Sequence, residues 1–208
     1  MLMRSLLLVL MGWAVCACAS AQDKAAAKPE VFLLLPEPRA ARTPHSLVLG
    51  DAKQTVFSPA QQSPDKSTIQ VYPAKEFAKL GISPETFAKK ARAAADRLLA
   101  SLKPELIRDT AGRVRYAVYR GESTIYACLL VAPSLAKTFE PVFGKEIWVA
   151  APDRNALYIF PPNPLVVDDF AGDLEDRFES NAYSASEEVF VMRSDTGVMR
   201  AVGTFTDR

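Results

Sequence analysis

Histidine is nearly absent from this chain, and its scarcity excludes several kinds of enzyme. The one histidine, His45, lies in a proline-rich stretch. A Ser-His-Asp or Cys-His nucleophile system needs a histidine beside the nucleophile, and a zinc site needs several His or Cys ligands. With one histidine, both kinds of site are unexpected. The nine glycines are scattered singly, so no glycine-rich phosphate loop is present. We therefore expect no metal, no cofactor and no catalytic residues of these classes, and we expect His45 to be solvated.

Cysteine is rare as well. Two of the three cysteines, Cys16 and Cys18, fall within the first 21 residues. An exported domain held by disulfides would carry an even set, so the fold has to depend on its hydrophobic core. The remaining Cys128 lies in the apolar run 125–131, where no basic neighbour stabilises a thiolate. We expect it to be a small buried residue.

The chain also lacks a long hydrophobic run. Leu6–Val15 is apolar except for Gly12, but about ten residues are too few for the ~20 that span a bilayer. With Arg4 before it and Ala19-Ser20-Ala21 after it, the run is typical of a bacterial secretory signal peptide. We predict cleavage after Ala21 and a periplasmic or secreted protein. Because Val15–Cys18 also resembles a lipidation box, a lipoprotein anchored at Cys18 stays open, and a membrane partner is expected only in that case.

Charge of one sign is not in excess. Without Arg4 the chain has 24 basic and 24 acidic residues. The distribution is uneven, because residues 75–121 carry eleven basic and five acidic residues and residues 122–208 carry seven and fourteen. The simplest interpretation is that the two parts complement each other within one domain. With export and no net positive charge, no nucleic-acid partner is expected.

Proline divides the chain into regions. Six of the fifteen prolines fall in residues 22–66, and proline excludes long helices there. We predict a signal peptide at 1–21, a proline-rich extended arm at 22–66 and a single α+β domain at 67–208. The apolar patches Val31–Leu35 and Ser46–Leu49 should dock on that domain or on a partner.

The domain should alternate helices with hairpins. The clearest helix signal is Ser83-Pro84-Glu85, a cap followed by residues that suit a first turn. Other helices are expected at 74–80, from 133, and from Asp168 and Asp169; strands are expected at 69–72, 113–120, 124–131, 147–151, 156–160, 188–192 and 198–205. This order predicts an α+β fold with a mainly antiparallel sheet of about six strands, built from three helix–hairpin units, with the helices packed on the sheet.

Three of the expected strands, 125–131, 147–151 and 156–160, are apolar on both faces. A sheet with one solvated face should alternate apolar and polar residues, so something has to cover the second face. The candidates are the 31–49 segment, a second subunit or an apolar ligand. Self-association or an apolar ligand on the sheet face is therefore expected.

Two sets of polar residues are candidates for binding. Asp153-Arg154-Asn155 is the most polar turn between the most apolar strands, and such turns sometimes carry sites; the simpler interpretation, which we favour, is an ordinary hairpin turn. Asp168 and Asp169 open an acidic segment in which Arg177 is the only basic residue through Glu179. Paired carboxylates can bind metal or perform acid–base chemistry, although a solvated helix face accounts for them too.

A family resemblance adds to this interpretation. The stretch 143–160, with its strand, proline-containing polar turn and second strand, is similar to the YtpQ-like bacterial family of unknown function, and Ser186–Phe190 fits the same pattern. The resemblance covers about residues 82–206 and implies a fold but no activity.

Together these features favour an exported, non-catalytic binding or protein-interaction module of the cell envelope. The alternatives are a hydrolase that uses carboxylates such as Asp153, Asp168 or Asp169, and a lipid-anchored surface protein.

Overall fold

The computed structural model describes residues 30–206. Its elements are β1 (Leu33–Pro38), η1 (Arg39–Ala41), β2 (Thr55–Gln62), β3 (Ile69–Val71), α1 (Ala74–Lys79), α2 (Pro84–Ser101), β4 (Glu105–Arg108), β5 (Val114–Arg120), η2 (Tyr126–Val131), α3 (Leu135–Phe143), β6 (Glu146–Ala150), β7 (Ala156–Phe160), α4 (Pro164–Asp168), α5 (Ala171–Ser180), β8 (Glu188–Arg193) and β9 (Met199–Thr204), where η marks a 3-10 helix. The predicted signal peptide, with Cys16 and Cys18, lies outside the described residues. Within 30–206, no helix is long and apolar enough to cross a membrane.

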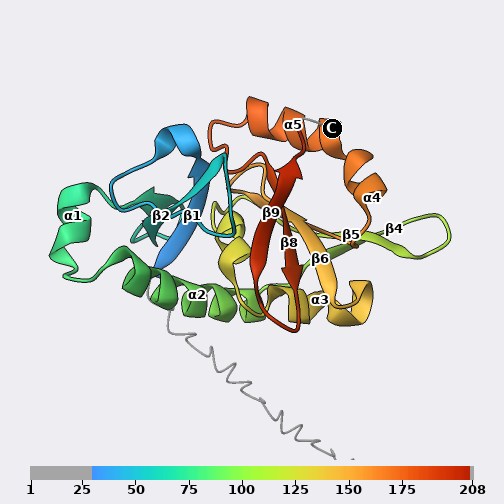
Figure 1. The fold of residues 1–208 in the computed structure, drawn as a ribbon, viewed down its shortest axis with the longest axis horizontal. Coiled ribbons are helices and arrows are strands. Elements are labelled where there is room, and N and C mark those ends of the chain that lie inside the picture. The colour runs from blue at the N-terminus through green and yellow to red at the C-terminus, as the bar shows by residue number, and fades with distance from the viewer. Residues whose placement is uncertain (1–29, 207–208) are drawn as a thin grey trace, which may run out of the picture.

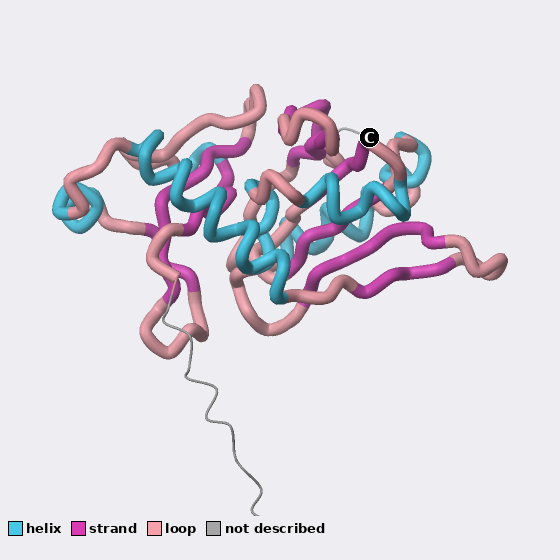
Figure 2. Tube along the Cα trace, turned by 90° about the horizontal axis from the view of Figure 1, so that it is seen from below, coloured by secondary structure: helices cyan, strands magenta, loops and turns pink. Residues whose placement is uncertain are grey.

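The strands form two antiparallel sheets, which confirms the α+β class. The larger sheet has the order β4-β5-β7-β6-β8-β9, and the smaller one has the order β1-β2-β3. The helix α2 begins at Pro84 as the sequence predicts, because the Ser83 side chain accepts a hydrogen bond from the Thr86 backbone N–H at 3.2 Å. In Figure 2, α2 lies in front of the strands, and the β4–β5 hairpin extends away from the body of the protein.

Helices cover both faces of the larger sheet. One face packs against α2, η2 and α3 in the largest hydrophobic cluster, and the other packs against Val167, Ala171 and Leu174 of α4 and α5. In Figure 1, α4 and α5 lie along the top of the view and α2 and α3 along the bottom. Leu34 and Leu47 of the expected 31–49 covering pack in the cluster on the first face, and the other face is covered by α4 and α5, which were not among the three coverings expected. A ligand or second subunit on that face no longer follows from the apolar strands.

Residues 30–66, expected to be an extended arm, contribute β1 and β2 to the smaller sheet. Leu33, Leu34 and Leu35 are fully buried, and β1 packs against α2 and η2. The apolar patch beginning at Val31 therefore docks as a strand, one of the outcomes that its composition allows. His45 is also buried, stacked on Phe77 with its Nε2 2.8 Å from the Tyr72 carbonyl oxygen, so the prediction of a solvated histidine was wrong.

The expected strand 124–131 was also wrong. Residues 126–131 form the 3-10 helix η2, and five of these six are buried. An apolar run buried on all sides gives no periodic signal, so a strand and a buried helix look alike in sequence. The strand that forms a hairpin with β5 is instead β4, whose short Glu-Leu-Ile-Arg sequence was not recognised. The three predicted helix–hairpin units are thus not confirmed as described.

Asp168 and Asp169 do not begin a helix. Asp168 is the last residue of α4, and Asp169 follows it as the C-cap. The helix α4 begins instead after Asn163, whose side chain accepts from the Leu165 backbone N–H, with Pro164 in its first turn. An asparagine followed by proline is as good a start signal as two aspartates, and here it is the one used.

Candidate functional site

The predicted binding turn Asp153–Asn155 lies inside the protein rather than at an open tip. The Asp153 side chain is fully buried. Its Oδ1 accepts a hydrogen bond from the Asn155 backbone N–H at 2.7 Å, and its Oδ2 lies 2.7 Å from Nη2 of Arg177 on α5. The Asn155 side chain donates to the Glu122 carbonyl oxygen at 3.0 Å. The turn therefore connects the β6–β7 hairpin to α5 and to the loop that follows β5.

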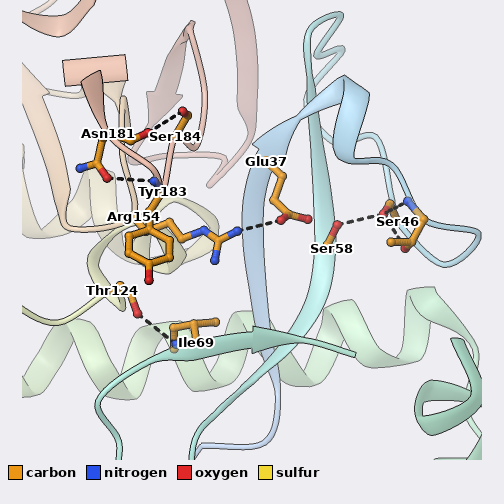
Figure 3. A network of polar contacts seen from close by, with 10 residues as sticks. Glu37, Ser46, Ser58, Ile69, Thr124, Arg154, Asn181, Tyr183 and Ser184 are labelled. Atoms are coloured by element: carbon orange, nitrogen blue, oxygen red, sulfur yellow. Dashed lines mark hydrogen bonds and ion pairs between the residues drawn. The ribbon is translucent and has the colours of Figure 1, made fainter. Parts of the chain in front are cut away.

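Arg154 reaches in the opposite direction, toward the smaller sheet. Figure 3 shows its guanidinium pointing to Glu37 on β1, and Nη2 lies 2.9 Å from Oε1 of that carboxylate. Both side chains are mostly buried, and the guanidinium lies 5.5 Å from the centre of the Tyr183 ring. Arg154 is thus occupied by a partner within the chain, and its predicted binding role remains untested.

Asp169 lies apart from this network, on the surface. It forms an ion pair with Arg115 at 2.7 Å, and both side chains are largely exposed. Arg115 in turn lies 4.8 Å from the centre of the Phe170 ring. The structure therefore separates Asp153, in the interior, from Asp168 and Asp169 at the end of α4, and does not bring them together as a carboxylate pair.

A cavity between α5 and the larger sheet adjoins both predicted groups. It has a volume of about 350 Å³. Its lining comes from β5, β7 and the segment from Phe170 to α5, and consists of Tyr116, Arg120, Tyr158, Phe170, Asp173, Leu174, Asp176 and Arg177. We call it the α5 cavity. Asp153 lies behind it as the partner of Arg177, and Asp169 adjoins it through Arg115 beside Phe170.

Aromatic rings form much of the α5 cavity. The rings of Tyr116 and Phe170 meet edge to face at 4.6 Å between centroids, and Tyr116 lies 6.1 Å from Tyr158. These are favourable separations for aromatic pairs. Tyr158 is 8% exposed. Within the described residues the hydroxyls of Tyr116 and Tyr158 have no hydrogen-bond partner, so both are available to a ligand.

Charge surrounds these rings. The Arg177 guanidinium lies 5.8 Å from the centre of the Tyr158 ring. Burial raises the pKa of Tyr158, with Arg177 acting in the opposite direction, so its hydroxyl is protonated at neutral pH and can donate. Arg120 is engaged by Glu105 through contacts of 2.7 and 3.2 Å, and this pair lowers the pKa of Glu105 and raises that of Arg120.

The α5 cavity thus offers flat apolar surfaces together with donors and acceptors. Asp173 and Asp176 accept, the two arginines donate, and tyrosine hydroxyls do both. Nothing in residues 30–206 gathers three His, Cys, Asp or Glu side chains around a common metal position. The arrangement suits recognition of a small ligand by stacking and hydrogen bonding.

Sequence reasoning missed most of this cavity. Tyr116 and Tyr158 were assigned to strands, but their shared face depends on the register that pairs Val118 with Tyr158. One available signal was Arg177, the lone basic residue of an acidic segment. A cation among carboxylates often has a specific partner, and here the partner is the buried Asp153.

Comparison with protein-family models, with curated proteins and with solved structures finds no match to this chain. The similarity of residues 82–206 to the YtpQ-like family therefore stays a prediction.

Proposed function

We propose that this protein is an exported, non-catalytic binding module of a bacterial cell envelope, and that it binds a saccharide in the α5 cavity. Export rests on the signal-peptide pattern that ends at Ala21. The alternative to cleavage after Ala21 is export as a lipoprotein anchored at Cys18. Lipid anchoring would leave the α5 cavity unchanged. The observation that supports binding is the cavity lining, in which three aromatic rings lie beside two arginines and two carboxylates.

The ring surfaces favour a ligand with an apolar face. Tyr116, Tyr158 and Phe170 present carbon-rich surface beside free hydroxyls. A pyranose ring has a C–H face that can stack on an aromatic ring and a rim of hydroxyls that both donate and accept. Tyrosine provides the complement of both parts in one side chain.

The charges around the cavity disfavour an anionic ligand. Arg120 and Arg177 line it together with Asp173 and Asp176, and both arginines already have carboxylate partners outside the lining, Glu105 and Asp153. Arg177 is held by the buried carboxylate of Asp153 at 2.7 Å. An arginine fixed in advance loses less side-chain entropy when it binds a ligand hydroxyl. A volume of about 350 Å³ is within the range of small-ligand pockets.

An array of bacterial cell-wall and capsular oligosaccharides tests this proposal, with the purified protein as the labelled probe. We expect binding to a limited set of these glycans, and loss of that binding in Tyr116→Ala, which removes a stacking surface. Tyr158→Phe keeps the ring and removes one hydroxyl, so about two- to tenfold weaker binding is expected.

Tyr183→Phe is the matched control, because Tyr183 is exposed and does not line the α5 cavity. The variant should bind as the parent protein does. An array on which the folded protein binds no glycan, or binds the same glycans after Tyr116→Ala, would refute the saccharide proposal.

A further inference from the structure

A second cavity lies at the other end of the larger sheet, where the loop before β2 meets β8 and β9. Its volume is about 470 Å³. Polar and charged groups dominate its lining, which consists of Asp51, Lys53, Gln54, Glu188, Arg200, Ala201, Val202, Gly203 and Thr204. We call it the β9 cavity. None of these residues belongs to the α5 cavity.

The β9 cavity contains a buried carboxylate that is only half satisfied. Glu188 is 3% exposed. Its Oε1 accepts a hydrogen bond from the Lys53 backbone N–H at 2.7 Å, whereas its buried Oε2 has no hydrogen-bond partner within the described residues. A buried charged oxygen without a donor carries a large desolvation cost. A ligand that supplies a donor, above all a cationic one, would remove that cost.

Two cations of the same cavity lack a counterion. Neither the Lys53 ammonium nor the Arg200 guanidinium forms an ion pair within residues 30–206, and both residues are exposed. Asp51 adds a second negative charge to the lining, so two positive and two negative side chains surround the space. The lining therefore has no net charge, but it keeps an unpaired carboxylate oxygen beside unpaired cations.

Backbone geometry keeps the cavity open. Gly203 lies at a φ of +153° and has no side chain to fill the space. On the opposite side, Gly50 holds the loop against β9, with the Ala201 N–H donating to the Gly50 carbonyl oxygen at 2.6 Å. The two walls are thus fixed with respect to one another before any ligand arrives.

We propose that the β9 cavity binds a small zwitterion, an amino acid or a short peptide with free termini. The ammonium donates to Oε2 of Glu188, and the carboxylate accepts from Arg200 and Lys53. A zwitterion matches both unpaired signs at once, whereas a simple anion leaves Glu188 unsatisfied and a simple cation leaves the two basic side chains unused. Charge-assisted hydrogen bonds of this kind are about twice as strong as neutral ones.

Three related dipeptides test this proposal by NMR titration of the purified full-length protein. Ala-Ala carries both charges, N-acetyl-Ala-Ala lacks the ammonium, and Ala-Ala-amide lacks the carboxylate. We expect Ala-Ala to shift the amide signals of residues 202–204, and each blocked dipeptide to bind at least about tenfold more weakly. No shift with Ala-Ala at millimolar concentration, or equal binding of all three, overturns the proposal.

Side-chain variants test which residue binds the ammonium of the ligand and which binds its carboxylate. Glu188→Gln should weaken Ala-Ala and abolish the preference over N-acetyl-Ala-Ala, and Arg200→Gln should weaken Ala-Ala while leaving Ala-Ala-amide unchanged. Lys103→Gln removes an exposed cation elsewhere and should change nothing. If Glu188→Gln does not fold, Arg200→Gln and the dipeptide series still decide the result. Because Tyr116 and Arg177 take no part, this outcome is independent of the saccharide proposal.

Discussion

At the scale of single residues, the contribution of a charged side chain to stability depends on how deeply it is buried rather than on its residue type. Asp153 and Asp169 are both aspartates that pair with an arginine at 2.7 Å, but the first side chain is 0% exposed and the second 60%. A carboxylate taken out of water depends on its partner, whereas an exposed pair is screened and contributes little. The two pairs should therefore respond very differently to the same substitution.

We expect Asp153→Ala to lower the free energy of unfolding by about 2 to 3 kcal/mol, because Arg177 loses its counterion and the Asn155 N–H loses its acceptor. Asp169→Ala should cost less than about 1 kcal/mol. Urea denaturation of the two variants measures both values. Equal effects would show that the buried pair does not stabilise the fold.

The thiol of Cys128 should be unreactive in the folded protein. The residue is fully buried, and burial raises its pKa to about 12, so almost no thiolate is present at pH 8. In a chain that begins at Gln22, Cys128 is the only cysteine. We expect slow labelling by a disulfide reagent in buffer and rapid labelling in guanidinium chloride; rapid labelling of the native protein would contradict this burial.

At the scale of elements, sequence reasoning succeeded where a local signal was complete. Ser83-Pro84 fixed the start of α2, and the strands β6 and β7, with the Pro152–Asn155 turn between them, were placed within about one residue. It failed at η2, where burial on all sides removes the periodic pattern, and at α4, where Asn163-Pro164 was the better start signal. These choices depend on tertiary packing, which one sequence does not display.

The contact between the loop before β2 and β9 depends on Gly50. Its φ is +60°, and an added Cβ would lie 2.7 Å from the Met199 carbonyl oxygen. Gly81 has a similar φ of +64° but open space around it, which makes it a matched control. We expect Gly81→Ala to cost about 1 kcal/mol, for backbone strain alone, and Gly50→Ala about 2 to 3 kcal/mol. Thermal unfolding measures the difference, and equal melting temperatures would exclude the close approach.

At the scale of the whole molecule, the N-terminal segment and the rest of the chain share one core. Leu34 and Phe57 belong to the same hydrophobic cluster as Phe190, and the Glu37–Arg154 pair connects β1 to the β6–β7 turn. The sequence placed a boundary near residue 67 because proline is frequent before it. It could not reveal this packing, since the contacts join residues more than 100 positions apart.

A fragment that contains only residues 67–208 tests this boundary. It lacks β1 and β2, so it would expose the apolar surface that they cover on α2 and η2. We expect the fragment to aggregate or to show no cooperative unfolding, whereas the longer chain unfolds in one transition. A fragment with a stable, cooperative fold would restore the predicted boundary.

The candidate site, too, depends on long-range packing that the sequence alone does not reveal. Asp153 and Asp169 were named from sequence as a turn and a helix start, and both adjoin the α5 cavity without lining it. The residues that do line it come from β5, β7, α5 and Phe170, the N-cap of α5. Only the pairing of β5 with β7, and the packing of α5 over them, bring Tyr116, Tyr158 and Arg177 together.

The most direct test of the binding proposal is an NMR titration of the aromatic side-chain signals with saccharides from the cell envelope. If the α5 cavity is the binding site, the ring signals of Tyr116, Tyr158 and Phe170 shift together, and those of the control residue Tyr183 do not. If a saccharide binds while the cavity rings stay unchanged, or if no saccharide binds the folded protein, the central claim is wrong.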